Sequence, residues 1–138
     1  MNNYQPRTAK PRILITDDEQ DIIEILSYNL EKENYEVFAG YSSTECLRLA
    51  KEVRPDLIIL DIWMPGTDGI ETCKILKRDP GFKNIPIILF TAFQKSILPE
   101  IAKESGADLF LSKPVRMNRI TAIIHDLLSN TSRHDYQN

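Results

Sequence analysis

Residues 57–61, Leu-Ile-Ile-Leu-Asp, are four consecutive apolar residues followed by an aspartate. An apolar run without polar alternation is typical of a strand that is buried on both faces, as in a parallel sheet covered by helices. Comparable runs occupy residues 12–16, 86–91 and 108–112, and residues 36–39 form a weaker one. The sequence therefore predicts five short strands.

Amphipathic helical patterns follow each of these runs. Residues 20–33 place Ile22, Ile23, Leu26 and Leu30 along one helical face, with acidic residues opposite. Further helices are predicted over residues 42–54, 68–78, 97–105 and 115–128. The chain thus alternates strand and helix five times.

The helix boundaries carry local signals. Ser42 with Glu45 three residues later has the form of a capping box at a helix start. Proline is tolerated in a first helical turn but not in an interior, so Pro99 predicts a short helix that begins near residues 97–98. Gly106 has the place of the residue that follows a helix C-terminus.

Strict alternation of this kind predicts an α/β fold in which a doubly wound, five-stranded parallel sheet carries helices on both faces. Open parallel sheets bind their ligands beyond the carboxyl ends of the strands. The predicted fold therefore indicates where functional side chains should be sought.

Composition limits the function classes. The chain has 138 residues, which fits one domain, and a net charge of −3 without a basic patch, which argues against direct nucleic-acid binding. Its longest apolar runs have four residues, far short of the ~20 that a membrane-spanning helix needs, and the N-terminus lacks the apolar segment of a secretory signal. Cys46 and Cys73 lie in predicted helices, which favours buried, reduced thiols and a cytoplasmic protein without a membrane partner.

Polar residues stand at the carboxyl ends of four predicted strands. Asp17 and Asp18 follow the first strand, and Asp61 ends the third. Thr91 ends the fourth strand and Lys113 follows the fifth. Taken singly, an acid before a helix is usually a favourable helix-terminal charge. Together, one hydroxyl and one amine around three carboxylates indicate a binding site.

Three neighbouring carboxylates resist simultaneous ionisation, and one lysine cannot neutralise them. Hard oxygen ligands select Mg²⁺ or Ca²⁺, and Mg²⁺ favours sites that a phosphate oxygen completes. A hydroxyl and an ammonium group are suitable donors to phosphoryl oxygens. The residues alone therefore point to a carboxylate that accepts a phosphoryl group beside magnesium.

Four segments resemble the receiver domain of two-component response regulators. They are ITDDE at 15–19, LIILDIWMPGTDGIE at 57–71, IPIILFTA at 85–92 and GADLFLSKP at 106–114. The resemblance covers residues 12–128 and implies a flavodoxin-like (βα)5 fold with strand order 2-1-3-4-5. It leaves residues 1–11 as a flexible N-terminal segment and residues 129–138 as a disordered polar tail.

The resemblance assigns a role to each site residue. Asp61 would be the phosphoacceptor and would form an acyl phosphate. Asp17 and Asp18 would bind Mg²⁺, with Asp61 and the backbone carbonyl of Trp63 as further ligands. Lys113 would pair with a phosphoryl oxygen or with the Asp61 carboxylate.

The same resemblance implies a conformational switch. Thr91 would move to bond the phosphoryl group, and the ring of Phe110 would turn inward as Thr91 shifts. The Lys113–Pro114 peptide bond would be cis. The phosphoryl group would come from a phosphohistidine of a sensor histidine kinase or a histidine phosphotransfer protein.

No output domain follows the last predicted helix, so we expect a stand-alone regulator of a phosphorelay that is not itself an enzyme and binds a downstream protein target. Trp63 and Phe93 either shield the acyl phosphate from water or, in the case of Trp63, merely pack the loop. Two alternative functions stay open. One is a pseudo-receiver that binds proteins without phosphorylation; the other is an Mg²⁺-dependent aspartyl-phosphate phosphatase, although the adjacent acids Asp17-Asp18 do not match the D-x-D motif of that class.

Overall fold

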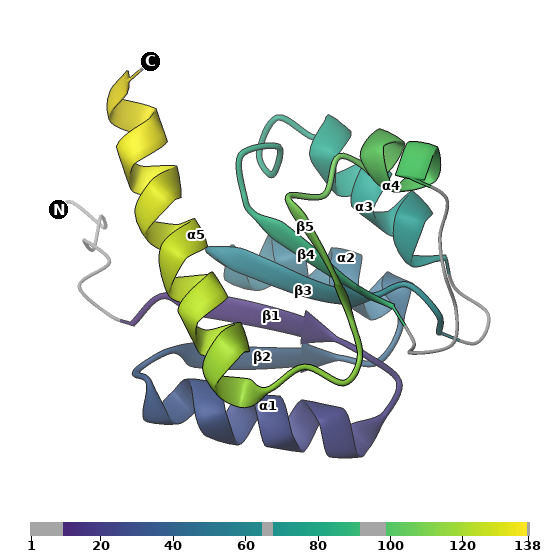
Figure 1. Ribbon diagram of the computed structural model, residues 1–138. Coiled ribbons are helices and arrows are strands. Elements are labelled where there is room, and N and C mark those ends of the chain that lie inside the picture. Colours follow the sequence, from purple (N-terminus) through teal and green to yellow (C-terminus); the bar gives the residue numbers. More distant parts are fainter. Residues whose placement is uncertain (1–9, 65–67, 92–98, 138) are drawn as a thin grey trace, which may run out of the picture.

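The computed structural model describes residues 10–64, 68–91 and 99–137. Five strands alternate with five helices along the chain (Figure 1). The strands are β1 (Arg12–Thr16), β2 (Glu36–Gly40), β3 (Leu57–Asp61), β4 (Ile87–Thr91) and β5 (Leu109–Ser112). The helices are α1 (Gln20–Lys32), α2 (Ser43–Val53), α3 (Gly69–Arg78), α4 (Pro99–Ser105) and α5 (Met117–Gln137).

All strand pairs are parallel, and the sheet has the order β2-β1-β3-β4-β5. Both the α/β class and the strand order implied by the resemblance are therefore confirmed. In this register Thr16 on β1 pairs with Leu60 on β3, and Thr91 on β4 pairs with Ser112 on β5. The carboxyl ends of β1, β3, β4 and β5 consequently lie at one edge of the sheet, which we call the carboxyl edge.

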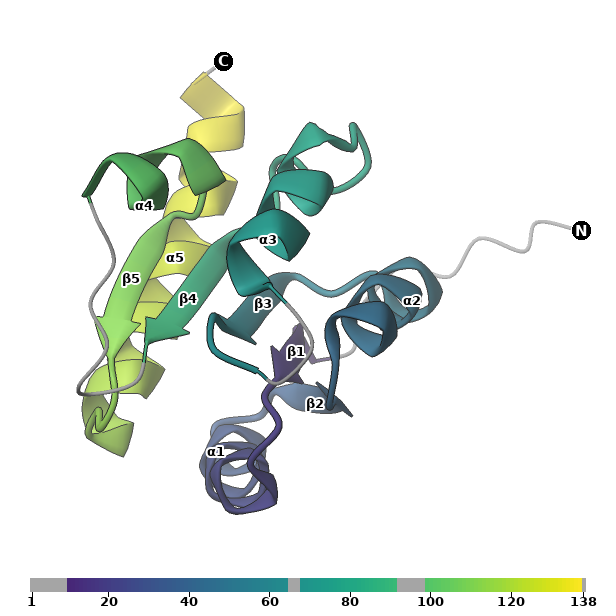
Figure 2. The ribbon, with the colours of Figure 1, turned by 90° about the vertical axis from the view of Figure 1, so that its right-hand side faces the viewer.

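Alternate strand residues face two separate apolar layers. Ile13, Ile15 and Ile59 pack with α1 and α5, whereas Leu14 and Ile58 pack with α2 and α3. Figures 1 and 2 show α1 and α5 on one face of the sheet and α2 and α3 on the other, with α4 beside α3. Every residue of β3 and β4 is buried, as the continuous apolar runs predict.

Local caps fix the helix ends. The Ser42 hydroxyl accepts a hydrogen bond from the Glu45 backbone N–H at 3.2 Å, which confirms the predicted N-cap. The Glu45 carboxylate accepts from the N–H of Tyr41 at 2.6 Å instead of from Ser42, one residue earlier than a capping box requires. Gly106 has a φ of 82°, the left-handed conformation expected after a helix.

The last helix is longer than predicted. We expected it to end at residue 128 and to give way to a disordered tail, but α5 continues to Gln137, and its final turns extend beyond the sheet (Figure 1). The fourth helix is short, as expected, and is described from Pro99 onward. Phe93, one of the two predicted shielding residues, lies outside the described residues.

Cys46 and Cys73 are both buried, as predicted, in the layer that α2 and α3 form. Across residues 10–64, 68–91 and 99–137, no helix combines the length and the hydropathy that crossing a membrane would require.

Candidate functional site

Four carboxylates meet at the carboxyl edge. Asp17, Asp18 and Glu19 follow β1, and Asp61 ends the neighbouring strand β3. Each contributes one oxygen atom to a group in which all four atoms lie within 4.8 Å of one another. The predicted convergence of the three aspartates is thus observed, and parallel pairing of β1 with β3 is its cause.

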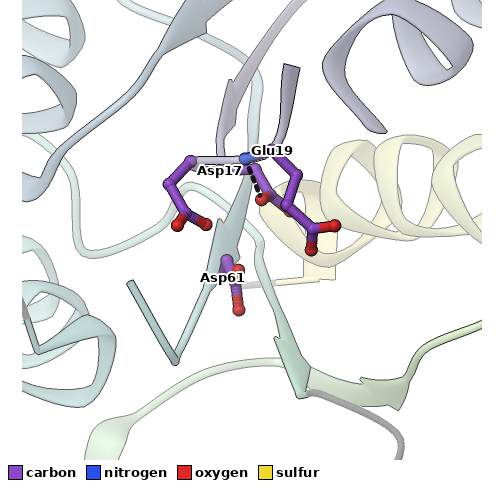
Figure 3. A group of neighbouring side chains, drawn as sticks. Asp17, Glu19 and Asp61 are labelled. Atoms are coloured by element: carbon purple, nitrogen blue, oxygen red, sulfur yellow. Dashed lines mark hydrogen bonds between the residues drawn. The ribbon is translucent and has the colours of Figure 1, made fainter. Parts of the chain in front are cut away.

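Two of these acids are buried and held by backbone amides. Asp17 and Asp61 are only 2% and 3% exposed. Asp17 Oδ1 accepts from the Glu19 N–H at 2.9 Å, and Asp61 Oδ1 accepts from the Trp63 N–H at 3.0 Å. Figure 3 shows Asp17, Glu19 and Asp61 at these two strand ends. In both aspartates the Oδ2 atom is directed to a third group, the ammonium of Lys113.

Lys113 is shared among three of the carboxylates. Its Nζ atom lies 2.7 Å from Asp17 Oδ2, 3.2 Å from Asp61 Oδ2 and 3.3 Å from Glu19 Oε1. The backbone N–H of Lys113 donates to the Thr91 carbonyl at 2.8 Å, which continues the β4–β5 ladder to this residue. The Lys113–Pro114 peptide bond is cis, as expected.

Burial and neighbouring charges shift the pKa values of Asp61 and Lys113. Burial is the main cause that raises the pKa of Asp61 from 3.8 to about 6, and the nearby Asp17 charge adds to it. The Trp63 N–H and the Lys113 ammonium act in the opposite direction. Burial lowers the pKa of Lys113, but the hydrogen bonds and charges of Asp17 and Asp61 outweigh it, so the pKa of Lys113 is raised.

The two expected switch residues lie on one face of the sheet. Thr91 is buried at the end of β4, and its hydroxyl is 3.2 Å from that of Ser112. Phe110 on β5 is partly buried against the layer that α2 and α3 form. Because Leu89 pairs with Phe110 and Thr91 with Ser112, a movement of Thr91 would be adjacent to the ring of Phe110.

The start of α3 lies against the end of β3. Asp68 caps this helix by accepting from the N–H groups of Ile70 and Glu71. A Cβ atom on Gly69 would lie 2.6 Å from the Asp61 carbonyl oxygen and 2.7 Å from Ile62 Cα. Only glycine allows the helix to approach the backbone of β3 this closely.

The Trp63 side chain is 43% exposed at the site rim. Its backbone N–H orients Asp61, whereas metal binding by its carbonyl and shielding by its ring stay predictions. Glu19 and Ser112 were missed as site residues. The only sequence signal for Glu19 was its place as the third consecutive acid, and Ser112 had none beyond its strand-end position.

The donor set fits a hard divalent cation. All four grouped residues offer carboxylate oxygens, and the one ammonium of Lys113 carries a single positive charge against them. An oxygen-only donor set of this kind suits Mg²⁺ or Ca²⁺.

Comparisons with known proteins agree with this geometry. The model of the response regulator receiver domain family matches residues 13–125. A putative response regulator from Chloroflexus aurantiacus is 30% identical, with 87% of this chain and 98% of that chain covered and a TM-score of 0.80. The signal receiver domain of a signal transduction histidine kinase from Syntrophus aciditrophicus is 34% identical, with 87% of this chain and 91% of that chain covered and a TM-score of 0.79. The chemotaxis response regulator CheY4 of Vibrio cholerae is 28% identical, with 86% of this chain and 99% of that chain covered and a TM-score of 0.78.

Proposed function

The chain belongs to the response regulator receiver domain family of two-component signalling, and we propose that it accepts a phosphoryl group on Asp61. One observation carries this proposal: the Asp61 carboxylate is buried and fixed between the Trp63 N–H and the Lys113 ammonium, beside three further acids. A carboxylate held in this way is a positioned nucleophile at the sheet edge where open α/β folds bind ligands.

The reaction exchanges one bond for another. A carboxylate oxygen of Asp61 attacks the phosphorus atom of a phosphohistidine, a new P–O bond forms, and the P–N bond breaks. The electron pair of the broken bond remains on the imidazole nitrogen of the donor. The product is an acyl phosphate on Asp61, and no oxidant or reductant is required.

Asp17, Asp18 and Asp61, with the Trp63 carbonyl, would hold Mg²⁺. Bound Mg²⁺ supplies positive charge that offsets the charge of the phosphoryl oxygens. Lys113 already lies within ion-pair distance of Asp17 and Asp61, so it can turn to a phosphoryl oxygen with a small displacement.

Thr91 and Phe110 would turn this reaction into a signal. The Thr91 hydroxyl exchanges its contact with Ser112 for a phosphoryl oxygen, and the Phe110 ring fills the space beside it. Phosphorylation thereby favours one conformer of the surface that β4 and β5 support. Trp63 would also slow hydrolysis of the acyl phosphate by covering part of the rim.

Receiver domains are signalling modules that act between histidine kinases or phosphotransfer proteins and downstream targets. For this chain we accordingly propose a phosphohistidine on one of these proteins as the donor and a protein as the target.

The proposal is tested by incubating the protein with Mg²⁺ and acetyl phosphate and measuring the intact mass. We expect the wild-type protein to gain one phosphoryl group and Asp61→Asn to gain none. Asp79→Asn is the matched control, because the Asp79 side chain accepts from the Gly81 N–H at the other end of α3 and an asparagine oxygen can replace it.

Each result separates the functions considered. Labelling of Asp61→Asn to the wild-type level would contradict the proposal. An unlabelled wild-type protein would favour the pseudo-receiver, and steady turnover of an added phosphomonoester would favour the phosphatase.

A further inference from the structure

Glu19 stands at the N-cap position immediately before α1, but its side chain does not cap the helix. It has the extended backbone of an N-cap residue, but its side chain makes no hydrogen bond to the first turn of the helix. Aspartate, asparagine and serine are preferred at this position because their short side chains reach those N–H groups. The glutamate is therefore in a position where its side chain contributes little to the helix.

The Glu19 carboxylate is directed to the site instead. Its Oε1 atom lies 3.3 Å from Lys113 Nζ, although the side chain is 61% exposed and has room to lie elsewhere. The backbone of the same residue donates to Asp17 Oδ1 at 2.9 Å (Figure 3), so the turn that orients Asp17 also places Glu19.

The spacing of the four carboxylates suits one cation. Mg²⁺ binds oxygen at about 2.1 Å, so oxygens on opposite sides of one ion are about 4.2 Å apart. The 4.8 Å limit that holds for all four grouped oxygens leaves Glu19 within reach of the ion, either directly or through one of the waters that Mg²⁺ retains.

Lys113 in its present position competes with a cation for Asp17 and Asp61. An ion that binds these two carboxylates takes the oxygens Oδ2 that Lys113 now contacts. The Glu19 side chain is exposed and pairs with Lys113, so it can adjust to the ion more freely than the two buried aspartates.

From these contacts we propose that the Glu19 carboxylate binds the divalent cation together with the three aspartates and thereby raises the affinity of the chain for Mg²⁺. This inference rests on the proposed function, because it concerns the same cation.

The test measures Mg²⁺ binding without a phosphodonor. Trp63 is the single tryptophan of the chain, and its backbone N–H donates to Asp61, so its fluorescence is used to follow the titration. Electron paramagnetic resonance of free Mn²⁺ gives a second value that does not depend on Trp63. We expect Glu19→Gln to raise the dissociation constants of both ions about tenfold or more, in the range found when outer ligands of a metal are removed.

Glu24→Gln is the matched control. It removes the same charge five residues further along the chain, where the Glu24 carboxylate accepts a hydrogen bond from the Gln20 side chain. Glu24 lies outside the group of four carboxylates, and salt weakens interactions between exposed charges, so this variant should change the affinity much less than Glu19→Gln does. Equal losses in the two variants would show a general charge effect and overturn the inference.

A second comparison uses Lys113→Met. If Glu19 acts on the cation, Glu19→Gln weakens binding by a similar factor in this background. If the factor disappears, Glu19 acts only by holding Lys113, and the inference is wrong. Unchanged affinity in Glu19→Gln, with Asp61 still labelled by acetyl phosphate, would overturn this inference alone. A wild-type protein that binds neither ion and is not labelled would overturn the proposed function as well.

Discussion

Lys77 and Lys113 lie toward opposite edges of the sheet, and each donates to three oxygen atoms. Lys77 Nζ contacts the carbonyls of Lys83 and Ile85 at 3.2 and 2.7 Å and Asp108 Oδ2 at 3.0 Å. The three oxygens around Lys113 all belong to carboxylates. The geometry of the two lysines is alike, but their charge balance is not.

Around Lys77 the charges are matched. One ammonium meets one carboxylate and two neutral carbonyls, and Asp108 Oδ2 also accepts from the Ile87 N–H at 2.8 Å. The pair joins the end of α3 to the starts of β4 and β5. The aliphatic part of Lys77 covers Gly106, where a Cβ atom would lie 3.1 Å from Lys77 Cγ. This is an arrangement that stabilises the fold and needs no further ligand.

Around Lys113 the negative charge is in excess, because three carboxylates face one ammonium. Burial, and to a smaller extent the charge of Asp17, raises the pKa of Asp61. Keeping repelling carboxylates buried lowers stability unless positive charge is added. The difference between the two lysines teaches how a binding site can be told from a structural ion pair: the structural pair is balanced without help, and the binding site is not.

The largest expected effect breaks the balanced pair. Lys77→Met should lower the free energy of unfolding by about 3 kcal/mol, because it removes three hydrogen bonds of about 1 kcal/mol each, two of them to backbone carbonyls. Urea unfolding with EDTA and with Mg²⁺ should give the same loss. Lys83→Met is the control, since only the Lys83 carbonyl takes part. A loss that Mg²⁺ reverses would contradict the structural role.

A smaller effect is expected at the unbalanced site. Lys113→Met should lower the free energy of unfolding by about 2 kcal/mol in EDTA, because the carboxylates of Asp17 and Asp61 lose their counter-charge. Mg²⁺ at ten times its dissociation constant should return about 1.4 kcal/mol, since it binds only the folded protein. If Mg²⁺ has no effect on this variant, the four carboxylates do not form a cation site.

The smallest effect is pH-dependent. The folded pKa of Asp61, about 6, lies above the 3.8 of an unperturbed carboxyl, so its ionisation opposes folding as pH rises through this interval. Asparagine does not titrate. In EDTA at pH 7.5, Asp61→Asn should therefore be more stable than wild type by on the order of 1 to 2 kcal/mol. Thermal unfolding at pH 4 should show the gain removed, and a gain that persists there would contradict the assigned cause.

Sequence reasoning succeeded where backbone topology alone places a residue. Asp17, Asp61 and Lys113 were predicted to meet because parallel strands bring their carboxyl ends to one edge, whatever rotamers the side chains adopt. The apolar runs of β3 and β4 predicted complete burial for the same reason: the pattern reports both faces of a strand.

It failed where the outcome depends on side-chain rotamers or on contacts between distant residues. The direction of the Glu19 carboxylate follows from a side-chain rotamer, and the pairing of Lys77 with Asp108 joins residues that neither motif nor periodicity connects. The end of α5 was wrong for another reason. A helix already formed extends by one backbone hydrogen bond per added residue, so α5 continues past Leu128 without an apolar pattern to announce it.

The contact at Gly69 makes one rigid unit of two elements. Gly69 has no Cβ atom, so the start of α3 lies directly against the backbone of Asp61, and the helix must move if that backbone moves. The Thr72 hydroxyl, one turn along, donates to Ser43 at 2.7 Å and ties the same helix to the start of α2. A substitution at position 69 would therefore both lower the stability of the fold and displace the backbone of Asp61.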